Sequence, residues 1–259
     1  MQSIASIPEL KVTEDRWLAE VLGCAVYKID PVSSRFTTED LTQVYSDALD
    51  SDRHALFYAK VDAEQVDQLN VFQATGMRVV DVNVTLERTA IKIDFSRSGS
   101  ADIHPKIKIA GHTTDDHAAL SAIAKNSFSY SRFHSDPFIE NQFADRTREA
   151  WLASYLAGTR GDYLLVATMN NRVAGFLAAM FIPDRRVAVI DLMAVDPDFR
   201  GQGVGLRLVK AFIDHYDGRC DTYRVGSQIA NQPALRLYSK CGFESKHAAY
   251  VMHKHIFVD

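Results

Sequence analysis

The sequence predicts an α/β protein, because apolar patterns with the periods of helices and of strands alternate along most of the chain. From Lys106 the order of the patterns is strand, two helices, three strands, helix, strand, helix and strand. The three consecutive strand patterns are separated by an Asn-Asn and a Pro-Asp pair, which is typical of an antiparallel meander. Directly after the meander, Gly201, Gly203 and Gly205 stand at the start of a helical pattern. This glycine-rich joint is the most informative feature of the chain.

The composition fits a globular protein of one large or two smaller domains. The chain has 259 residues, of which 47% are hydrophobic and 24% are charged. A formal net charge of −4 gives no electrostatic reason to expect nucleic acid or an anionic membrane as a partner. The three cysteines have neither CxxC nor zinc spacing, and the sequence shows no signal peptide or long apolar run. We therefore expect a cytoplasmic protein, a monomer or a homodimer, that binds neither nucleic acid nor a membrane.

A linker is predicted between two strand-bearing parts of the chain. The stretch 86–120 has a middle rich in serine, glycine and aspartate between two alternating apolar segments. We place the boundary at residues 96–104, which gives an N-terminal α/β accessory domain of residues 1–98 and a larger domain of residues 104–259.

The N-terminal domain contains a segment that matches the end of the chain. Residues 69–86 align with residues 235–252 without a gap, and both run helix, glycine, apolar residue and alternating strand. Phe72 then takes the place of Tyr238. If the match reflects an internal duplication, the first copy has lost both the hydroxyl group and the glycine stretch, and it has no chemistry of its own.

The elements of the larger domain follow from their periods and their end signals. Alternation at period two predicts strands, and apolar residues spaced by three and four predict helices. Thr113 and the aspartates after it indicate a helix start, whereas Gly158 and Gly242 indicate helix ends. Asn231 is a candidate N-cap, with Pro233 in the first turn. The predicted strands cover residues 106–111, 162–169, 172–182, 186–195, 220–228 and 244–257, and the predicted helices cover residues 113–128, 137–158, 203–216 and 231–243.

Glycines at the start of a helix indicate a binding site for phosphate. Glycine permits positive φ and a close approach of the backbone to a ligand. The unpaired N–H groups of the first turn lie at the positive end of the helix dipole and attract an anion. A tight turn that needs glycine for packing alone is the alternative interpretation. The chain lacks GxxxxGK(S/T), and its glycine spacing does not fit GxGxxG, so neither a P-loop nor a dinucleotide-binding fold is predicted.

Two motifs of the larger domain resemble those of the GCN5-related N-acetyltransferase (GNAT) superfamily. The stretch LMAVDPDFRGQGVG is similar to the family's acetyl-CoA-binding signature (Q/R)xxGx(G/A), which Arg200, Gly203 and Gly205 satisfy. The later stretch NQPALRLYSKCGF resembles the family's second motif. The resemblance covers residues 106–257. It implies the GNAT fold, in which a central mixed, largely antiparallel sheet is flanked by helices, with the smaller N-terminal α/β domain as a degenerate GNAT-like half.

The resemblance also implies acetyl-CoA or another short acyl-CoA as co-substrate, and no metal. The glycine loop would hold the CoA pyrophosphate, and the strand before the loop would pair with the pantetheine arm. Asn231 would contact the pantetheine or the acyl group. The implied cofactor-binding residues are Leu192, Met193, Ala194, Val195, Arg200, Gly201, Gln202, Gly203, Val204, Gly205 and Asn231.

Transfer of an acyl group from a thioester to an amine requires a proton donor for the leaving CoA thiolate. A phenol stays protonated at neutral pH and can donate to sulfur, so Tyr238, which matches the family's tyrosine, is the predicted general acid. The amine proton can pass to Asp191, to His134, or through water to solvent. Cys241 has no activating histidine near it in the sequence, so we expect direct attack in a ternary complex without an acyl-enzyme.

The segment 128–143, which joins two predicted helices, is the candidate acceptor site. Its aromatic, guanidinium and carboxylate groups suit a polar ring compound. With the extra N-terminal domain, this segment looks like the branch of the superfamily that acylates dTDP-linked 6-deoxy amino sugars, including the dTDP-fucosamine acetyltransferases. The resemblance implies that an acetyl or other short acyl group passes to the amine of a nucleotide-linked amino-deoxy sugar in polysaccharide biosynthesis. The predicted substrate-binding residues are Tyr130, Arg132, Phe133, His134 and Asp136.

Two other functions stay open from the sequence. A protein or peptide N-acetyltransferase would need an open peptide groove, which no sequence feature marks. A non-catalytic acyl-CoA-binding sensor would keep the glycine loop, but the presence of Tyr238 argues against it. His253 and His255 share one face of the last strand, yet the sequence identifies no third ligand, so we expect no metal.

Overall fold

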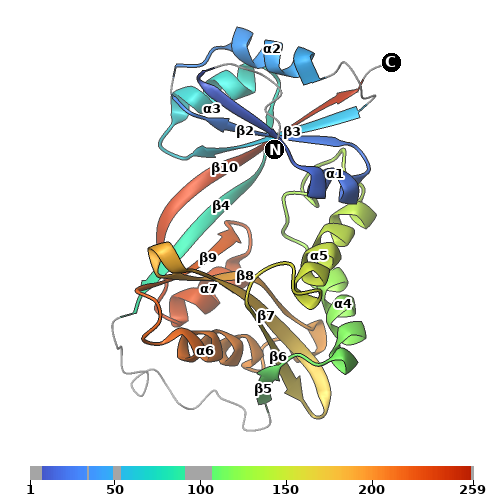
Figure 1. Cartoon of the computed structure of the whole chain (residues 1–259), viewed down its shortest axis with the longest axis vertical. Coiled ribbons are helices and arrows are strands. Elements are labelled where there is room, and N and C mark those ends of the chain that lie inside the picture. The colour runs from blue at the N-terminus through green and yellow to red at the C-terminus, as the bar shows by residue number, and fades with distance from the viewer. Residues whose placement is uncertain (1–7, 34, 49–53, 91–106, 258–259) are drawn as a thin grey trace. The chain divides into compact units, whose positions relative to one another are not determined.

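The computed structural model describes residues 8–33, 35–48, 54–90 and 107–257. The chain divides into two compact units, and Figure 1 labels most of their elements. Unit 1 contains the described residues of Met1–Asn83, Tyr130–Thr147 and His247–Asp259, and unit 2 contains those of Val84–Ser129 and Arg148–Lys246.

The units are not consecutive stretches of sequence. The predicted linker at residues 96–104 lies outside the described residues, so the division into domains 1–98 and 104–259 stays a prediction. Unit 1 gains the end of the chain through strand pairing. There β10 (Glu244–Phe257) runs antiparallel to β3 (His54–Asp62), from Ala249 opposite Asp62 to Phe257 opposite His54.

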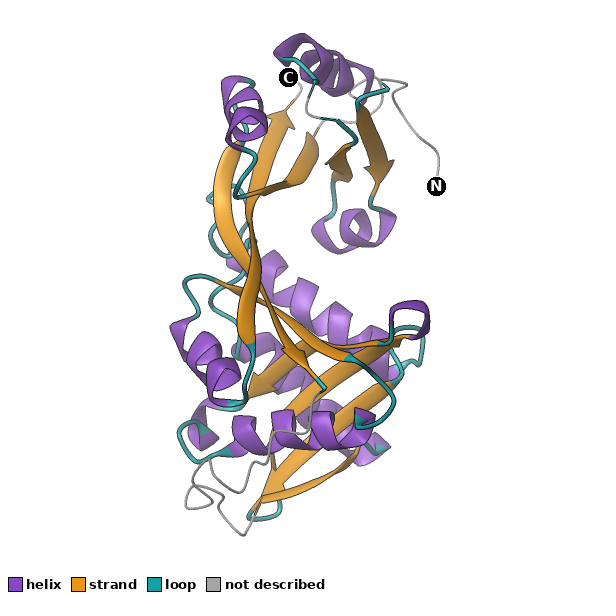
Figure 2. Cartoon of the chain, turned by 90° about the vertical axis from the view of Figure 1, so that its left-hand side faces the viewer, coloured by secondary structure: helices purple, strands orange, loops and turns teal. Residues whose placement is uncertain are grey.

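Unit 2 is a mixed, largely antiparallel sheet with helices on both faces (Figure 2), as predicted. Its strand order is β4-β9-β8-β7-β6-β5; the neighbours from β5 to β8 are antiparallel, and β8 and β9 are parallel. Helix α6 packs on one face, and α4 and α5 pack on the other. The strands are β4 (Arg78–Thr89), β5 (Ile107–Gly111), β6 (Tyr163–Met169), β7 (Arg172–Ile182), β8 (Val187–Val195) and β9 (Thr222–Gln228), and the helices are α4 (His117–Asn126), α5 (Asn141–Leu156), α6 (Val204–Tyr216) and α7 (Gln232–Lys240).

A β-bulge in β8 changes which side chains face which helices. Along the ladder with β7, Ala178 lies opposite Leu192 and Ala179 lies opposite Ile190, so Asp191 has no residue opposite it. Ile190 consequently packs with α6, whereas Leu192 packs with α4 and α5. In a regular strand these two residues would share one face of the sheet.

Unit 1 is a smaller α/β unit, again as predicted. Its strand order is β1-β2-β3-β10-β4, in which β2 and β3 are parallel and the pairs β1–β2 and β3–β10 are antiparallel. Phe57, Phe72 and Met252 are fully buried in its largest core cluster. The remaining elements are β1 (Leu10–Glu14), α1 (Arg16–Leu22), β2 (Ala25–Pro31), α2 (Thr38–Ala48) and α3 (Val66–Ala74).

The predicted internal match extends to the backbone. Gly76 and Gly242, which follow α3 and α7, have φ values of 86° and 81°, in the left-handed region that favours glycine. In both joints the N–H of the next residue donates to the carbonyl oxygen of the aligned aromatic residue, at 3.1 Å for Phe72 and 3.0 Å for Tyr238. The two joints therefore have the same geometry, while their origin by duplication stays a prediction.

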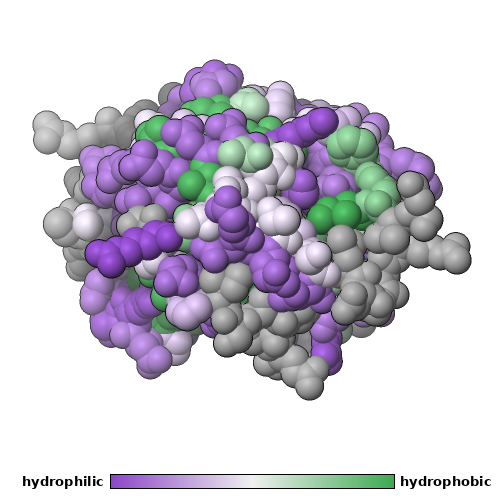
Figure 3. Space-filling model, turned by 90° about the horizontal axis from the view of Figure 1, so that it is seen from above, coloured by the Kyte–Doolittle hydropathy of each residue, from purple (hydrophilic) through white to green (hydrophobic). Residues whose placement is uncertain are grey.

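The exposed side chains are mostly polar on the face drawn in Figure 3. Among the coloured residues of this face, hydrophilic ones predominate, and hydrophobic residues form small separate areas between them. Among the described residues, no helix is both long and apolar enough to span a lipid bilayer.

Candidate functional site

The predicted cofactor loop lies within unit 2, between β8 and α6. Asp196 begins it by accepting the N–H of Asp198 at 2.8 Å, which caps the short 3-10 turn Pro197–Phe199. Helix α6 then begins at Val204 with Gly203 as N-cap, and no side chain forms a cap hydrogen bond there. The first N–H groups of α6 therefore lack a side-chain acceptor, at the positive end of the helix dipole. This arrangement suits the phosphate of a bound ligand.

The three glycines of the loop are required for two different reasons. Gly201 and Gly203 have φ values of 74° and 83°, which residues with a Cβ rarely adopt. A Cβ on Gly201 would meet no atom within 4 Å, so this side of the loop is open. A Cβ on Gly205 would lie 3.0 Å from Cδ2 of Leu237 and 3.7 Å from Cε of Met193. Packing thus explains Gly205, and the positive φ of the turn explains Gly201 and Gly203.

Polar side chains hold the loop against neighbouring backbone. Arg200 donates from Nε to the carbonyl oxygen of Val195 and from Nη2 to that of Ser127, both at 3.2 Å. Nε2 of Gln202 donates to the carbonyl oxygen of Asp198 at 2.9 Å. Arg200 and Gln202 therefore order the loop, and their contact with a CoA phosphate stays a prediction.

The end of β8 offers backbone groups beside this loop. Strand β8 pairs with β9 only from Val187 opposite Thr222 to Ile190 opposite Val225. Beyond the bulge, the described ladders pair residues 192–195 with β7 alone. Apart from the carbonyl oxygen of Val195, which accepts from Arg200, their other edge can therefore exchange hydrogen bonds with an extended ligand, as the family resemblance implies for the pantetheine arm.

Tyr238 is buried on α7 and keeps its proton. Its side chain is 5% exposed and packs in the core cluster that contains Cys241 and Phe243. Burial raises the pKa of the phenol above its ordinary value of 10.0, because the ionised form is poorly solvated there. No described residue forms a hydrogen bond with the Tyr238 hydroxyl group. The hydroxyl is protonated and free to donate, as a general acid requires.

The N-terminus of α7 is built as the sequence predicts. The side chain of Asn231 caps the helix by accepting the N–H of Ala234 at 3.2 Å, and Pro233 lies in the first turn. Contact of Asn231 with acyl-CoA stays a prediction. Leu237 brings α7 against the first turn of α6, since it is the side chain nearest to the vacant Cβ position of Gly205. Tyr238 is the next residue along this helix.

Asp191, at the bulge, is occupied by four hydrogen bonds. Its Oδ2 accepts from Trp151 Nε1 at 2.9 Å and from the Tyr155 hydroxyl at 2.7 Å. Arg160 donates from Nε to Oδ2 at 2.6 Å and from Nη2 to Oδ1 at 3.0 Å, and this bonding raises the pKa of the guanidinium. The carboxylate joins α5 and Arg160 to the sheet, and these contacts do not favour its predicted role as a base.

The partners of Asp191 were not predicted from the sequence. Trp151 and Tyr155 are four residues apart and so share one face of α5, which is a signal that the sequence contains. Nothing local indicates that this face meets the bulge, because the bulge depends on the pairing of β7 with β8.

Three of the predicted acceptor-binding residues are held inside unit 1. Phe133 and Asp136 are 4% and 3% exposed. His134 lies between two partners, with Nδ1 2.6 Å from the Ser131 hydroxyl and Nε2 3.0 Å from Oδ1 of Asp145. Both ring nitrogens of His134 are therefore engaged. Roles for His134 as a base and for these residues in substrate binding stay predictions.

Tyr130 and Arg132 differ in their access to a ligand. The guanidinium of Arg132 stacks over the rings of Tyr58 and Phe133, 4.2 Å and 4.6 Å from their centres. The Tyr130 side chain is 44% exposed. Among the five predicted residues, Tyr130 is thus the one whose side chain is most open to a ligand.

Cys241 does not have the properties of a nucleophile. It is 1% exposed, and burial raises the pKa of its thiol to about 11. The thiolate, which is the reactive form, is therefore scarce near neutral pH. This agrees with direct transfer of the acyl group to the amine.

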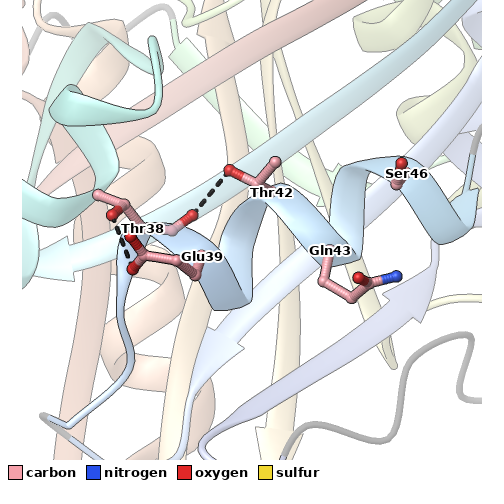
Figure 4. Close-up of a pocket in the computed structure, with 5 residues that line it drawn as sticks. All are labelled: Thr38, Glu39, Thr42, Gln43 and Ser46. Atoms are coloured by element: carbon pink, nitrogen blue, oxygen red, sulfur yellow. Dashed lines mark hydrogen bonds between the residues drawn. The ribbon is translucent and has the colours of Figure 1, made fainter.

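A shallow polar hollow of about 270 Å³ lies on α2 in unit 1 (Figure 4). All its lining side chains come from this one helix, and two of them are already bonded within it: Thr38 donates to Glu39, and Thr42 donates to the carbonyl oxygen of Thr38. The hollow contains no combination of groups that suggests chemistry. Its lining residues are Thr38, Glu39, Thr42, Gln43 and Ser46.

Comparison with known proteins agrees with the geometry of unit 2. The model of the Acetyltransferase (GNAT) family matches residues 123–243. The ribosomal protein bS18 alanine N-acetyltransferase of Escherichia coli is 30% identical over 113 residues, which are 43% of this chain and 68% of that protein. Among solved structures, a GCN5-related N-acetyltransferase from Sphaerobacter thermophilus has a TM-score of 0.67 at 14% identity, and the match covers 96% of this chain and 78% of that one.

Two further relatives match over most of the chain. The spore coat polysaccharide biosynthesis protein SpsD of Bacillus subtilis is 24% identical over 240 residues, which are 92% of this chain and 80% of SpsD. The dTDP-fucosamine acetyltransferase of Escherichia coli is 24% identical over 200 residues, which are 76% of this chain and 80% of that enzyme.

Proposed function

The chain belongs to the GNAT family and is an acyl-CoA-dependent N-acyltransferase, and we propose that it acylates the amine of a dTDP-linked amino-deoxy sugar. The observation that carries the choice of acceptor is the length of the match to SpsD. It spans 92% of the chain, so it includes residues of both units, and SpsD is named for polysaccharide biosynthesis. The match to the dTDP-fucosamine acetyltransferase supports dTDP as the nucleotide.

A peptide amine is the second candidate acceptor. The bS18 alanine N-acetyltransferase has the higher identity, 30%, but its match covers only 43% of this chain. That match supports transfer of an acyl group to an amine, but it does not account for the residues of this chain that lie outside it. The sugar acceptor accounts for more of the chain.

Acyl-CoA supplies the thioester, and the groups of unit 2 fit it. The open first turn of α6 binds the phosphates, and the edge of residues 192–195 that β9 leaves unpaired binds the extended arm. The two sites follow one another along the chain, so one extended molecule can occupy both.

The acceptor amine attacks the carbonyl carbon of the thioester in this mechanism. The C–N bond forms and the C–S bond breaks, and Tyr238 gives its hydroxyl proton to the departing sulfur. The excess proton of the amine leaves through water, because Asp191 and His134 are both engaged by other side chains. The products are the amide and free CoA, and Tyr238 regains a proton from solvent.

Release of CoA thiol tests the proposal. The full chain is incubated with acetyl-CoA or longer acyl-CoAs and with each member of a panel of dTDP- and UDP-linked amino sugars. We expect turnover with at least one dTDP-amino sugar and a short acyl donor. Turnover with an alanine-initiated peptide and none with the sugars would establish the second candidate instead.

A Tyr238→Phe variant separates an enzyme from a binding protein. We expect the variant to bind acyl-CoA with unchanged affinity by calorimetry and to lose turnover. Binding without turnover in the unmodified chain, across both classes of acceptor, would contradict catalysis of these reactions.

A further inference from the structure

Two histidines and one aspartate form a buried cluster within unit 1. His253 and His255 are two residues apart on β10 and therefore project from the same face of the strand. Asp136 reaches them from a turn, which its side chain stabilises by accepting the N–H of Phe138 at Oδ1, at 3.0 Å. The three side chains are at most 4% exposed. The sequence predicts no metal because it identifies no third ligand beside the two histidines. In the structure, Asp136 is in the position of that third ligand.

We propose that unit 1 binds one zinc ion through Asp136, His253 and His255. Imidazole nitrogen and carboxylate oxygen are the ligands that Zn²⁺ prefers apart from thiolate. One potential ligand atom from each of the three residues lies within 4.8 Å of the others. Both imidazoles already point at one oxygen, with Nδ1 of His253 2.6 Å and Nε2 of His255 2.8 Å from Oδ2 of Asp136.

The two nitrogen atoms must move away from the carboxylate oxygen to make room for an ion. Bonds of about 2.0–2.1 Å in a tetrahedral site place the ligand atoms about 3.3 Å from one another. Nδ1 of His253 would therefore move from 2.6 Å, and Nε2 of His255 from 2.8 Å, to about 3.3 Å from the carboxylate oxygen. Water completes the fourth position of such a site.

The charge of the cluster also favours a cation. The ion pairs of Asp136 with described residues involve the two histidines and no lysine or arginine. Buried carboxylates are normally paired with a cation or bound to a metal.

A third histidine, His54, orients the site from outside. Nδ1 of His255 lies 3.0 Å from Nε2 of His54, so the nitrogen of His255 that faces away from Asp136 has a partner. Histidines that bind metal usually have such a partner for the second nitrogen, which fixes the ring. The rings of Phe133 and Phe138 lie 6.1 Å from His253 and 5.2 Å from His255, and they enclose the cluster with apolar surface. The zinc would thus fasten the turn of Asp136 to β10 and stabilise unit 1.

Zinc binding is tested on the full chain after removal of metal with a chelator. We expect calorimetry and elemental analysis to show one zinc per chain, and the melting temperature to rise with added zinc. Co²⁺ in place of zinc should give the strong visible absorption of a tetrahedral site. Absence of stoichiometric zinc at micromolar concentration, or of that absorption, would overturn the proposal.

Variants locate the site. We expect Asp136→Asn and His255→Gln to lose stoichiometric binding and His54→Ala to weaken it about 10- to 100-fold. His247→Gln is the matched control, because His247 lies on the same strand and bonds to Asp62 outside the cluster. Circular dichroism verifies folding, and the zinc and cobalt titrations of the unmodified chain decide the proposal if a variant does not fold. Undiminished binding in the first two variants would place the zinc elsewhere and refute this site.

Discussion

Replacing Asp191 by alanine separates a structural role of this carboxylate from a role as general base. The side chain of Asp191 is 11% exposed, and that of its partner Arg160 is 40% exposed. Hydrogen bonds to a charged group contribute about 1.5–3 kcal/mol each, so the bonds from Trp151 and Tyr155 contribute about 3 kcal/mol at the lower end of this range. The ion pair with the half-exposed Arg160 adds about 0–1 kcal/mol. We therefore expect Asp191→Ala to lower the free energy of unfolding by about 3–4 kcal/mol.

Urea denaturation of the full chain measures this loss. Asp221→Ala is the matched control, because Asp221 forms an ion pair with Arg186 in the same unit and its side chain is 67% exposed. The control should lose less than about 1 kcal/mol. Asp191→Asn keeps an oxygen acceptor of the same shape and should lose less stability than Asp191→Ala.

Kinetics of Asp191→Asn complete the test. Loss of a general base lowers turnover by about 10²–10⁴-fold. If Asp191 is structural, the folded Asp191→Asn protein retains turnover within about tenfold of the unmodified chain, well short of that loss. A variant that keeps its stability within about 1 kcal/mol but loses turnover by 100-fold or more would refute this reasoning and assign the base to Asp191.

Four further results are expected. Tyr238→Phe should lower turnover by about 10²–10⁴-fold in the thiol-release assay, and unchanged turnover would remove the proposed acid. Because burial raises the pKa of Tyr238 above 10.0, its acid form persists as pH rises, and a pH profile of kcat that falls with a midpoint below pH 9 through loss of this proton would contradict the assignment. Gly203→Ala, at a φ of 83°, should cost about 1–2 kcal/mol and raise the KM for acyl-CoA, whereas Gly218→Ala, at a φ of 74° after α6, should cost a similar amount of stability without changing KM. Cys241→Ala should retain turnover, and loss of turnover in a folded variant would support an acyl-enzyme intermediate on Cys241.

Features with a local signal in the sequence were predicted correctly. The α/β class, the meander and the N-cap at Asn231 depend on residues close to one another in the chain. The joint between β8 and α6 also has a local signal, the three glycines within residues 201–205. The sequence did not show that Gly205 is required for packing and the other two glycines for their positive φ. Gly205 and Leu237 are 32 positions apart and come into contact only in the folded chain.

Features that depend on long-range pairing were not predicted. The residues of β8 are apolar on both faces apart from Asp191, so the sequence has no alternation from which a bulge could be recognised. Asp136 and His253 are 117 positions apart, and only the pairing of β10 with β3 brings that end of the chain into unit 1. Phe133 and Asp136 are buried because their segment belongs to unit 1 together with the end of the chain. The polar composition of this segment had instead favoured a site on the surface.

In the proposed function, this chain transfers an acyl group to the amine of a nucleotide-linked sugar. Its most direct test is mass spectrometry of the products after incubation with isotopically labelled acetyl-CoA, a dTDP-amino sugar and an alanine-initiated peptide together. We expect the label to appear as an amide on the amino sugar, and we expect Tyr238→Phe to lower the yield of this product by about 10²–10⁴-fold. Label on the peptide and none on the sugar would refute the proposed acceptor.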